Sequence, residues 1–225
     1  MLVGMTNLRL WLPALAGPLI VTVGLLGLHS APFVFLFYHA ILCLLVPALV
    51  AFREGRSLAA HLRELGLVRR GLQASLALGL VSALAPPAAY MLLPQAFPDT
   101  ARLQAALGDW GLATTAPGSF LFFMAVVNGP AEELFWRGWL LRSPATGRGA
   151  KVLLAMLFTS YHAVTIGRLA PSTGAAALLV AGVFGAAMFW TWTRVRWQSV
   201  WPALLSHTGA TCGYLFICAQ LLDRG

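Results

Sequence analysis

Long apolar runs separated by short polar segments make up most of this chain. About seven of them are long enough to cross roughly 30 Å of hydrocarbon as helices. They lie near 11–29, 31–52, 72–94, 117–141, 151–167, 174–192 and 198–221. This pattern predicts an all-α fold, a polytopic membrane helix bundle of about seven to eight transmembrane helices. Because no convincing internal repeat is present, we expect one transmembrane domain spanning residues 1–225.

Two of the connecting segments have a helical pattern of their own. In 53–70, Leu58, Leu62 and Leu65 alternate with Arg and Glu. This spacing suits an amphipathic helix at the cytoplasmic surface, and an ordinary solvated loop is the alternative. The segment 96–116 predicts a short interfacial helix without chemistry of its own.

The composition excludes a soluble globular domain. Hydrophobic residues make up 59% of the chain and charged residues only 10%, whereas soluble domains carry about 25% charged residues. The mean hydropathy of +0.79 agrees with a membrane protein.

The net charge of +8 is explained by membrane topology, and we expect no nucleic-acid partner. With 53–70 in the cytoplasm and the spans alternating from there, only Arg102, Arg168 and Arg224 fall outside. The basic residues that fall inside are Arg9, Arg53, Arg56, Arg63, Arg69, Arg70, Arg142, Arg148, Lys151, Arg194 and Arg196. This bias predicts a cytoplasmic N-terminus. Because all basic residues except Lys151 are Arg, a common bacterial bias, we expect a multi-pass protein of the bacterial inner membrane.

Two carboxylates and a guanidinium interrupt the apolar run 117–141, at Glu132, Glu133 and Arg137. Ionisable groups in hydrocarbon cost at least a few kcal/mol each and usually mark a functional polar cavity. We therefore expect a buried polar site on this span.

Three side chains on different spans are predicted to meet at one depth. Each of Glu132, His162 and His207 lies ten or eleven residues from the basic residue that marks the cytoplasmic end of its span. At 1.5 Å per residue, this distance is on the order of 15 Å. His39, on the second span, has no such partner and is assigned a structural role.

Helical spacing separates the two glutamates. Glu133 and Arg137 are four residues apart and can form an intrahelical ion pair, which is a structural brace by itself. Glu132 and Arg137 are five apart, which turns them roughly 140° from each other. Glu132 is thus the carboxylate left free for another partner.

A glutamate and histidines converging on a water molecule form a general-base arrangement that can hydrolyse a peptide bond. A further hydrogen-bond donor would stabilise the oxyanion. Glu132, His162 and His207 are also a plausible zinc set. The chain lacks the His-Glu-x-x-His motif of zinc proteases, so we expect no metal cofactor.

Three motifs in this order resemble those of the CPBP intramembrane proteases. This family includes the type II CAAX prenyl endopeptidases and the bacteriocin-processing or immunity (Abi) proteins. Its E-E-x-x-x-R-G motif resembles residues 132–138, its F-x-x-x-H motif resembles Phe158 to His162, and the approach to its H-x-x-x-N/D motif resembles residues 199–207. The signature region spans about 117–215.

The resemblance implies a glutamate-dependent protease that needs no metal. Glu132 would activate the water with help from His162, and Glu133 and Arg137 would support the site. His207 and the residue four positions later would stabilise the oxyanion.

The chain departs from the family motif at Thr211, which replaces the expected Asn or Asp. The Thr211 hydroxyl offers one donor proton, whereas an amide offers two. Asn128, one turn before Glu132 on the same face, could supply an amide instead.

We therefore expect an intramembrane endopeptidase that cleaves a membrane protein or peptide in contact with the lipid bilayer. A non-catalytic immunity or scaffold protein that keeps the polar motif is one alternative. A proton-coupled transporter is another, although the chain shows no inverted repeat.

Overall fold

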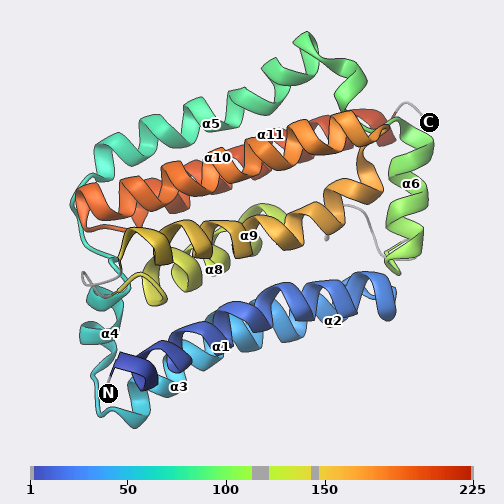
Figure 1. Cartoon of the computed structure of the whole chain (residues 1–225). Coiled ribbons are helices and arrows are strands. Elements are labelled where there is room, and N and C mark those ends of the chain that lie inside the picture. Colours follow the sequence, from blue (N-terminus) through green and yellow to red (C-terminus); the bar gives the residue numbers. More distant parts are fainter. Residues whose placement is uncertain (1–2, 113–121, 143–146, 224–225) are drawn as a thin grey trace.

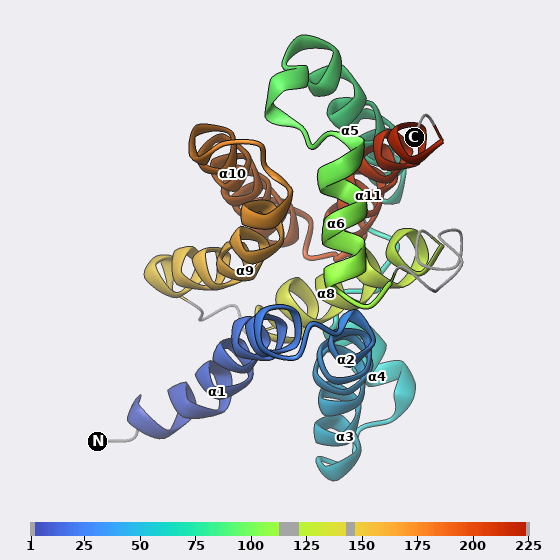
Figure 2. The same ribbon diagram turned by 90° about the vertical axis from the view of Figure 1, so that its right-hand side faces the viewer.

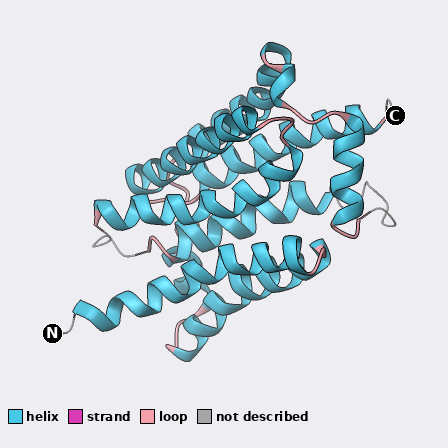
Figure 3. Cartoon of the chain, turned by 45° about the vertical axis from the view of Figure 1, so that its right-hand side comes forward, coloured by secondary structure: helices cyan, strands magenta, loops and turns pink. Residues whose placement is uncertain are grey.

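The computed structural model describes residues 3–112, 122–142 and 147–223, and every regular element in these ranges is a helix (Figure 3). The all-α prediction is confirmed. The elements are α1 (Val3–Thr22), η1 (Val23–Gly27), α2 (Ala31–Val34), η2 (Phe35–Leu45), α3 (Val46–Arg53), α4 (Leu58–Glu64), α5 (Leu72–Leu92), η3 (Pro94–Ala96), α6 (Thr100–Asp109), η4 (Met124–Asn128), α8 (Gly129–Glu133), η5 (Leu134–Trp139), α9 (Arg148–Leu169), α10 (Thr173–Trp197) and α11 (Trp201–Leu222). Among them η1, η2, η4 and η5 are π-helical.

Four helices of the described ranges are long and apolar enough to cross a membrane. They are Ala31–Arg53, Leu72–Leu92, Arg148–Leu169 and Thr173–Trp197. The apolar helix Trp11–Gly27 is shorter, and α11 carries several polar residues. The total of seven to eight spans and the cytoplasmic N-terminus stay predictions.

The long helices run side by side with a similar tilt (Figure 1). Seen from the end, α8 lies near the centre of the bundle (Figure 2). It packs against α11 and η2, while η5 also packs against α10. The two glutamates of α8 are therefore surrounded by protein rather than by lipid.

Helices α5 and α11 approach each other at small residues. A Cβ atom added to Gly209 would lie 2.1 Å from the carbonyl oxygen of Gly79, and one added to Gly213 would lie 2.2 Å from that of Ala83. Packing through small residues lets helix backbones come close in a membrane. This seam fixes the position of α11, which carries His207.

We expect Gly209→Ala to destabilise the protein by about 1–3 kcal/mol, because the new methyl group cannot fit without parting the two backbones. Gly182→Ala on α10 is the matched control, since a Cβ there meets nothing within 4 Å. Thermal unfolding in detergent measures both variants. Equal midpoints of thermal unfolding for Gly209→Ala and Gly182→Ala would contradict the close packing of α5 against α11.

Helix α6 lies across one end of the bundle (Figures 1 and 2) and is tied to several helices there. Thr100 Oγ1 donates to the Leu221 carbonyl on α11 at 2.9 Å. Arg102 Nη1 donates to the Ala170 carbonyl at the end of α9 at 3.0 Å. The helix predicted within 96–116 is confirmed at 100–109, and residues 113–116 of that segment lie outside the described ranges.

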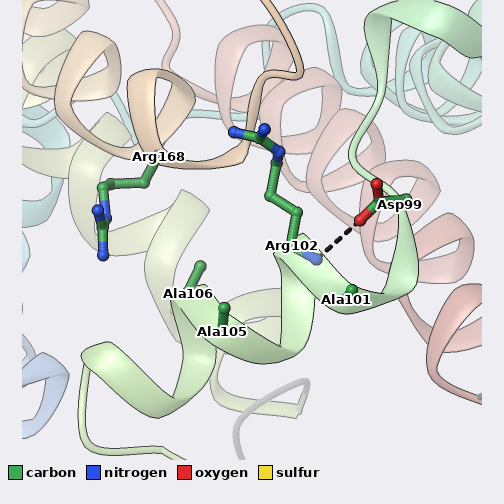
Figure 4. A pocket seen from close by; sticks show the side chains of 6 residues that line it. All are labelled: Asp99, Ala101, Arg102, Ala105, Ala106 and Arg168. Carbon is green, nitrogen blue, oxygen red and sulfur yellow. Dashed lines mark hydrogen bonds between the residues drawn. The ribbon is translucent and has the colours of Figure 1, made fainter.

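A cavity of about 400 Å³ opens beside α6 (Figure 4). Its lining includes the charged side chains of Asp99, Arg102 and Arg168. The Asp99 carboxylate accepts the backbone N–H of Arg102 at 2.7 Å, which caps the first turn of α6. None of the predicted site residues lines this cavity.

The segment after α3 contains the short helix α4, so a helix within 53–70 is confirmed. Leu58 is exposed, whereas His61 and Leu65 face the protein. Burial, together with the nearby guanidinium groups of Arg56 and Arg142, lowers the pKa of His61. His61 is therefore neutral at pH 7.

Candidate active site

The two glutamates lie on α8, a single turn of α-helix between the π-helices η4 and η5. π-Helical segments inside helices occur frequently at functional sites. Close packing at the start of α8 favours a glycine, because a Cβ on Gly129 would lie 3.1 Å from Thr208 Oγ1 and 3.3 Å from the Thr208 nitrogen. Helix α8 thus packs closely against α11 at this point.

Glu133 joins two helices through one carboxylate oxygen. Arg137 Nη1 donates to Glu133 Oε1 at 2.8 Å, and His207 Nδ1 is 2.9 Å from the same oxygen. Glu133 is fully buried. The predicted Glu133–Arg137 ion pair is confirmed, and the structure adds His207 to it.

Hydrogen bonds and an aromatic ring hold the Arg137 side chain in place. Its Nη2 donates to the Ala187 carbonyl at 3.2 Å, and its guanidinium carbon lies 4.3 Å from the centre of the Phe158 ring. A cation over an aromatic face is attracted by the ring quadrupole. Arg194 Nε donates to the Arg137 carbonyl at 2.9 Å, near the C-terminal end of η5, where backbone acceptors lack helical partners.

Glu132 is just as buried, with 2% of its surface exposed, but it lacks an arginine partner. Its Oε1 lies 3.8 Å from His39 Nε2, and its Oε2 lies 3.7 Å from His207 Nε2. Within the described ranges, Oε2 has no hydrogen-bond partner. The angular separation of the two glutamates predicted this difference.

The structure brings together the three residues that the depth count singled out. One ligand atom from each of Glu132, His162 and His207 lies within 4.8 Å of the other two. His162 Nδ1 is 2.9 Å from the Phe158 carbonyl oxygen, to which it can only donate. His207 Nδ1 donates likewise to Glu133, so in each ring Nε2 is the nitrogen left for the site, with a lone pair when the ring is neutral and an N–H when it is protonated.

Such a set can take a proton from water or hold a divalent metal ion. Histidine ligands of metals usually donate their second ring N–H to a carboxylate or a backbone carbonyl, as both imidazoles do here. Glu132, His162 and His207 thus fit a zinc ion, which would polarise a carbonyl and lower the pKa of a bound water.

Residues 114–212 match the family model described as type II CAAX prenyl endopeptidase Rce1-like. Over this segment the chain is similar to the Rce1-like family. This is a protease family, and the apolar helices agree with a membrane protein. No curated protein and no solved structure matches the chain.

The Rce1-like segment contains Glu132, His162 and His207 but ends far from His39, which lies on η2. The prediction that His39 lacks a partner at this depth is wrong. Its Nε2 lies 2.6 Å from Asn128 Oδ1 and faces Glu132. The aromatic neighbours of His39 in sequence suggested a packing role, and its contact with Asn128 could not be read from spacing.

Asn128 is buried and lies beside the Glu132–His39 pair, as its one-turn spacing from Glu132 predicts. Thr211 lies one turn after His207 on α11 and is partly buried. No pattern in the sequence pointed to Thr208, whose hydroxyl is buried beside Gly129.

Several polar atoms around the Rce1-like motifs lack hydrogen-bond partners in the part of the chain that the structure describes. They are Glu132 Oε2, Glu133 Oε2, His39 Nδ1, Tyr161 Oη and Thr208 Oγ1. Buried polar groups are normally satisfied by protein or by ordered water. Their concentration here indicates a place for water or for polar groups of a ligand.

The three residues of this cluster differ in exposure. Glu132 and His207 are buried, whereas His162 is only partly buried and lies on α9.

Proposed function

We propose that the chain is an intramembrane endopeptidase that hydrolyses a peptide bond of a membrane-associated protein or peptide. The observation that carries this proposal is the buried Glu132 carboxylate, whose unpartnered oxygen faces His207 while His162 lies within 4.8 Å. A carboxylate and two imidazoles at this separation can share one water molecule.

The reaction begins when Glu132 removes a proton from that water, with His162 orienting it through Nε2. The water oxygen bonds to the carbonyl carbon, and the carbonyl oxygen becomes an oxyanion. His207 lies between the carboxylates of Glu132 and Glu133 and is protonated on both nitrogens in this step. It donates to the oxyanion through Nε2–H. The C–N bond then breaks as the amine takes the proton from Glu132.

Glu133 and Arg137 support this chemistry without touching the substrate. Glu133 fixes the ring of His207, and Arg137 neutralises Glu133. The amide of Asn128 is a further oxyanion donor, since Thr211 offers only a hydroxyl.

The chain is proposed to act as a multi-pass protein of the cell membrane, with the site open to the cytoplasmic leaflet. Its substrate is a membrane protein or peptide cleaved near its membrane segment or C-terminus. The family description suggests prenylated C-terminal CAAX sequences as the first substrates to test.

The experiment compares C-terminal fragments of membrane proteins in cells that carry the wild type and in cells that carry Glu132→Gln. Purified protein is tested in parallel on a quenched fluorescent CAAX peptide, with and without a farnesyl group. Fragments and peptide cleavage that depend on Glu132 support the proposal. Equal products from both forms would overturn it.

Thr211 favours a second candidate, a non-catalytic membrane scaffold that keeps the polar motif as a brace. A scaffold would show the same phenotype in cells that carry Glu132→Gln as in cells that carry the wild type. The fragment comparison therefore separates the two candidates.

We propose that the reaction needs no metal, because general-base catalysis by Glu132 requires only proton transfer. Dialysis against EDTA is expected to leave peptide cleavage within about twofold of the untreated enzyme. Elemental analysis of the same sample should find no stoichiometric metal. Activity lost on chelation and restored by zinc would contradict this proposal and assign Glu132, His162 and His207 as ligands.

A further inference from the structure

His39 enters the site from a part of the chain that the family match does not cover. It lies on η2, with 4% of its surface exposed, and aromatic rings surround it. The Tyr38, Phe35 and Phe123 rings have their centres 4.8, 5.9 and 5.7 Å from the centre of the imidazole. These contacts hold the ring in place, and its close polar neighbours are Asn128 and Glu132.

The hydrogen bond between His39 and Asn128 has a defined direction. At 2.6 Å from His39 Nε2, the Asn128 oxygen can only accept, so Nε2–H donates. His39 Nδ1 is buried without a hydrogen-bond partner in the described ranges and carries the lone pair. With its oxygen held in this way, the Asn128 amide turns both of its N–H donors away from His39.

Asn128 and Glu132 lie on one face of their helix, because they are four residues apart. His39 Nε2 is also 3.8 Å from Glu132 Oε1, so the three side chains form one group. On α11, by contrast, the position one turn after His207 holds Thr211 rather than an amide. The site thus has its amide on the helix of Glu132 instead of the helix of His207.

We propose that His39 is a positioning residue that orients the Asn128 amide as an oxyanion donor, in place of the amide missing at position 211. This inference rests on the proposed peptide hydrolysis at Glu132. His39 acts only through Asn128 and does not touch the substrate.

The first test is kinetic and uses whichever of the two fluorescent CAAX peptides is cleaved. Loss of one oxyanion-hole donor typically costs 10²–10³-fold in kcat. We expect His39→Leu to lower kcat by about 10²-fold and to leave KM within about threefold. His39→Gln, whose amide can still donate to Asn128, should retain kcat within about tenfold of the wild type. Equal losses in both variants would indicate a packing role only.

Asn128→Asp separates the role of the amide oxygen, which accepts from His39, from the role of the amide N–H donors. Aspartate can still accept from His39 but has no N–H donors when ionised. We expect its kcat to be as low as that of Asn128→Ala. Full activity of Asn128→Asp would overturn the proposal.

The double variant His39→Leu/Asn128→Ala tests the coupling. Because His39 acts through Asn128, the double variant should be no slower than Asn128→Ala alone. Losses that multiply to about 10⁴-fold would show that the two residues act separately.

A measurement without turnover tests the hydrogen bond itself. Nitrogen NMR of ¹⁵N-histidine-labelled protein should show His39 protonated on Nε2, and Asn128→Leu should shift that signal. A wild-type His39 protonated on Nδ1 would overturn the proposal. Cleavage that depends on Glu132 but is unaffected by His39→Leu overturns this inference alone, whereas equal cleavage by wild type and Glu132→Gln overturns the proposed function as well.

Discussion

Glu132→Gln is expected to lower kcat by about 10³-fold, within the range that general acid–base catalysis contributes. Glutamine has nearly the same shape as glutamate but cannot take a proton from water. The measurement is the cleavage rate of the fluorescent CAAX peptide, with KM determined from the same series. Glu132 has no arginine partner, and His207 keeps Glu133 as its charged acceptor when Glu132 is changed.

The folded state should therefore tolerate this change. Thermal unfolding of Glu132→Gln in detergent should stay within about 1 kcal/mol of the wild type, as expected where no buried charge loses its partner. A variant that keeps at least a third of the wild-type turnover would rule out Glu132 as the general base.

Glu133→Gln is expected to act mainly on stability, with a loss of about 3–5 kcal/mol, because it leaves the charge of Arg137 buried and unpaired. Arg137 is 1% exposed, so water cannot replace the lost carboxylate. His207 also loses its charged acceptor. Denaturant unfolding in mixed micelles measures the change in free energy.

The double variant Glu133→Met/Arg137→Met is the control. It removes both charges at once, and buried ion pairs replaced by apolar residues often cost little stability. It should be more stable than Glu133→Gln, although cleavage should be lost because His207 is no longer oriented. A double variant less stable than the single one would show that the ion pair itself stabilises the fold.

The all-α fold and the meeting of Glu132, His162 and His207 followed from the sequence because each depends on one regular spacing. A helix rises by a fixed amount per residue, so the distance from a basic marker predicts depth. The Glu133–Arg137 pair followed from the angle between residues four apart. These quantities are local to single helices.

His39, the α5–α11 seam and the place of α6 depend on how helices pack, which spacing within one helix does not encode. His39 lies fourteen residues from Arg53, which is about 21 Å along an α-helix. By this count it lies deeper in the membrane than His162 and His207. The stretch Phe35–Leu45 is π-helical, however, so an α-helical count does not give its depth. The role of Gly79, Gly209 and Gly213 is clear only from the structure, in which the backbones of α5 and α11 lie side by side.

Helix α6 also links the ends of the two helices that carry His162 and His207. Arg168 of α9 forms an ion pair with Asp109 of α6, and Arg102 of α6 donates to the Ala170 carbonyl at the end of α9. Thr100 of α6 donates to the Leu221 carbonyl on α11. Because His162 lies on α9 and His207 on α11, α6 limits how far these two helices can move apart at this end of the bundle.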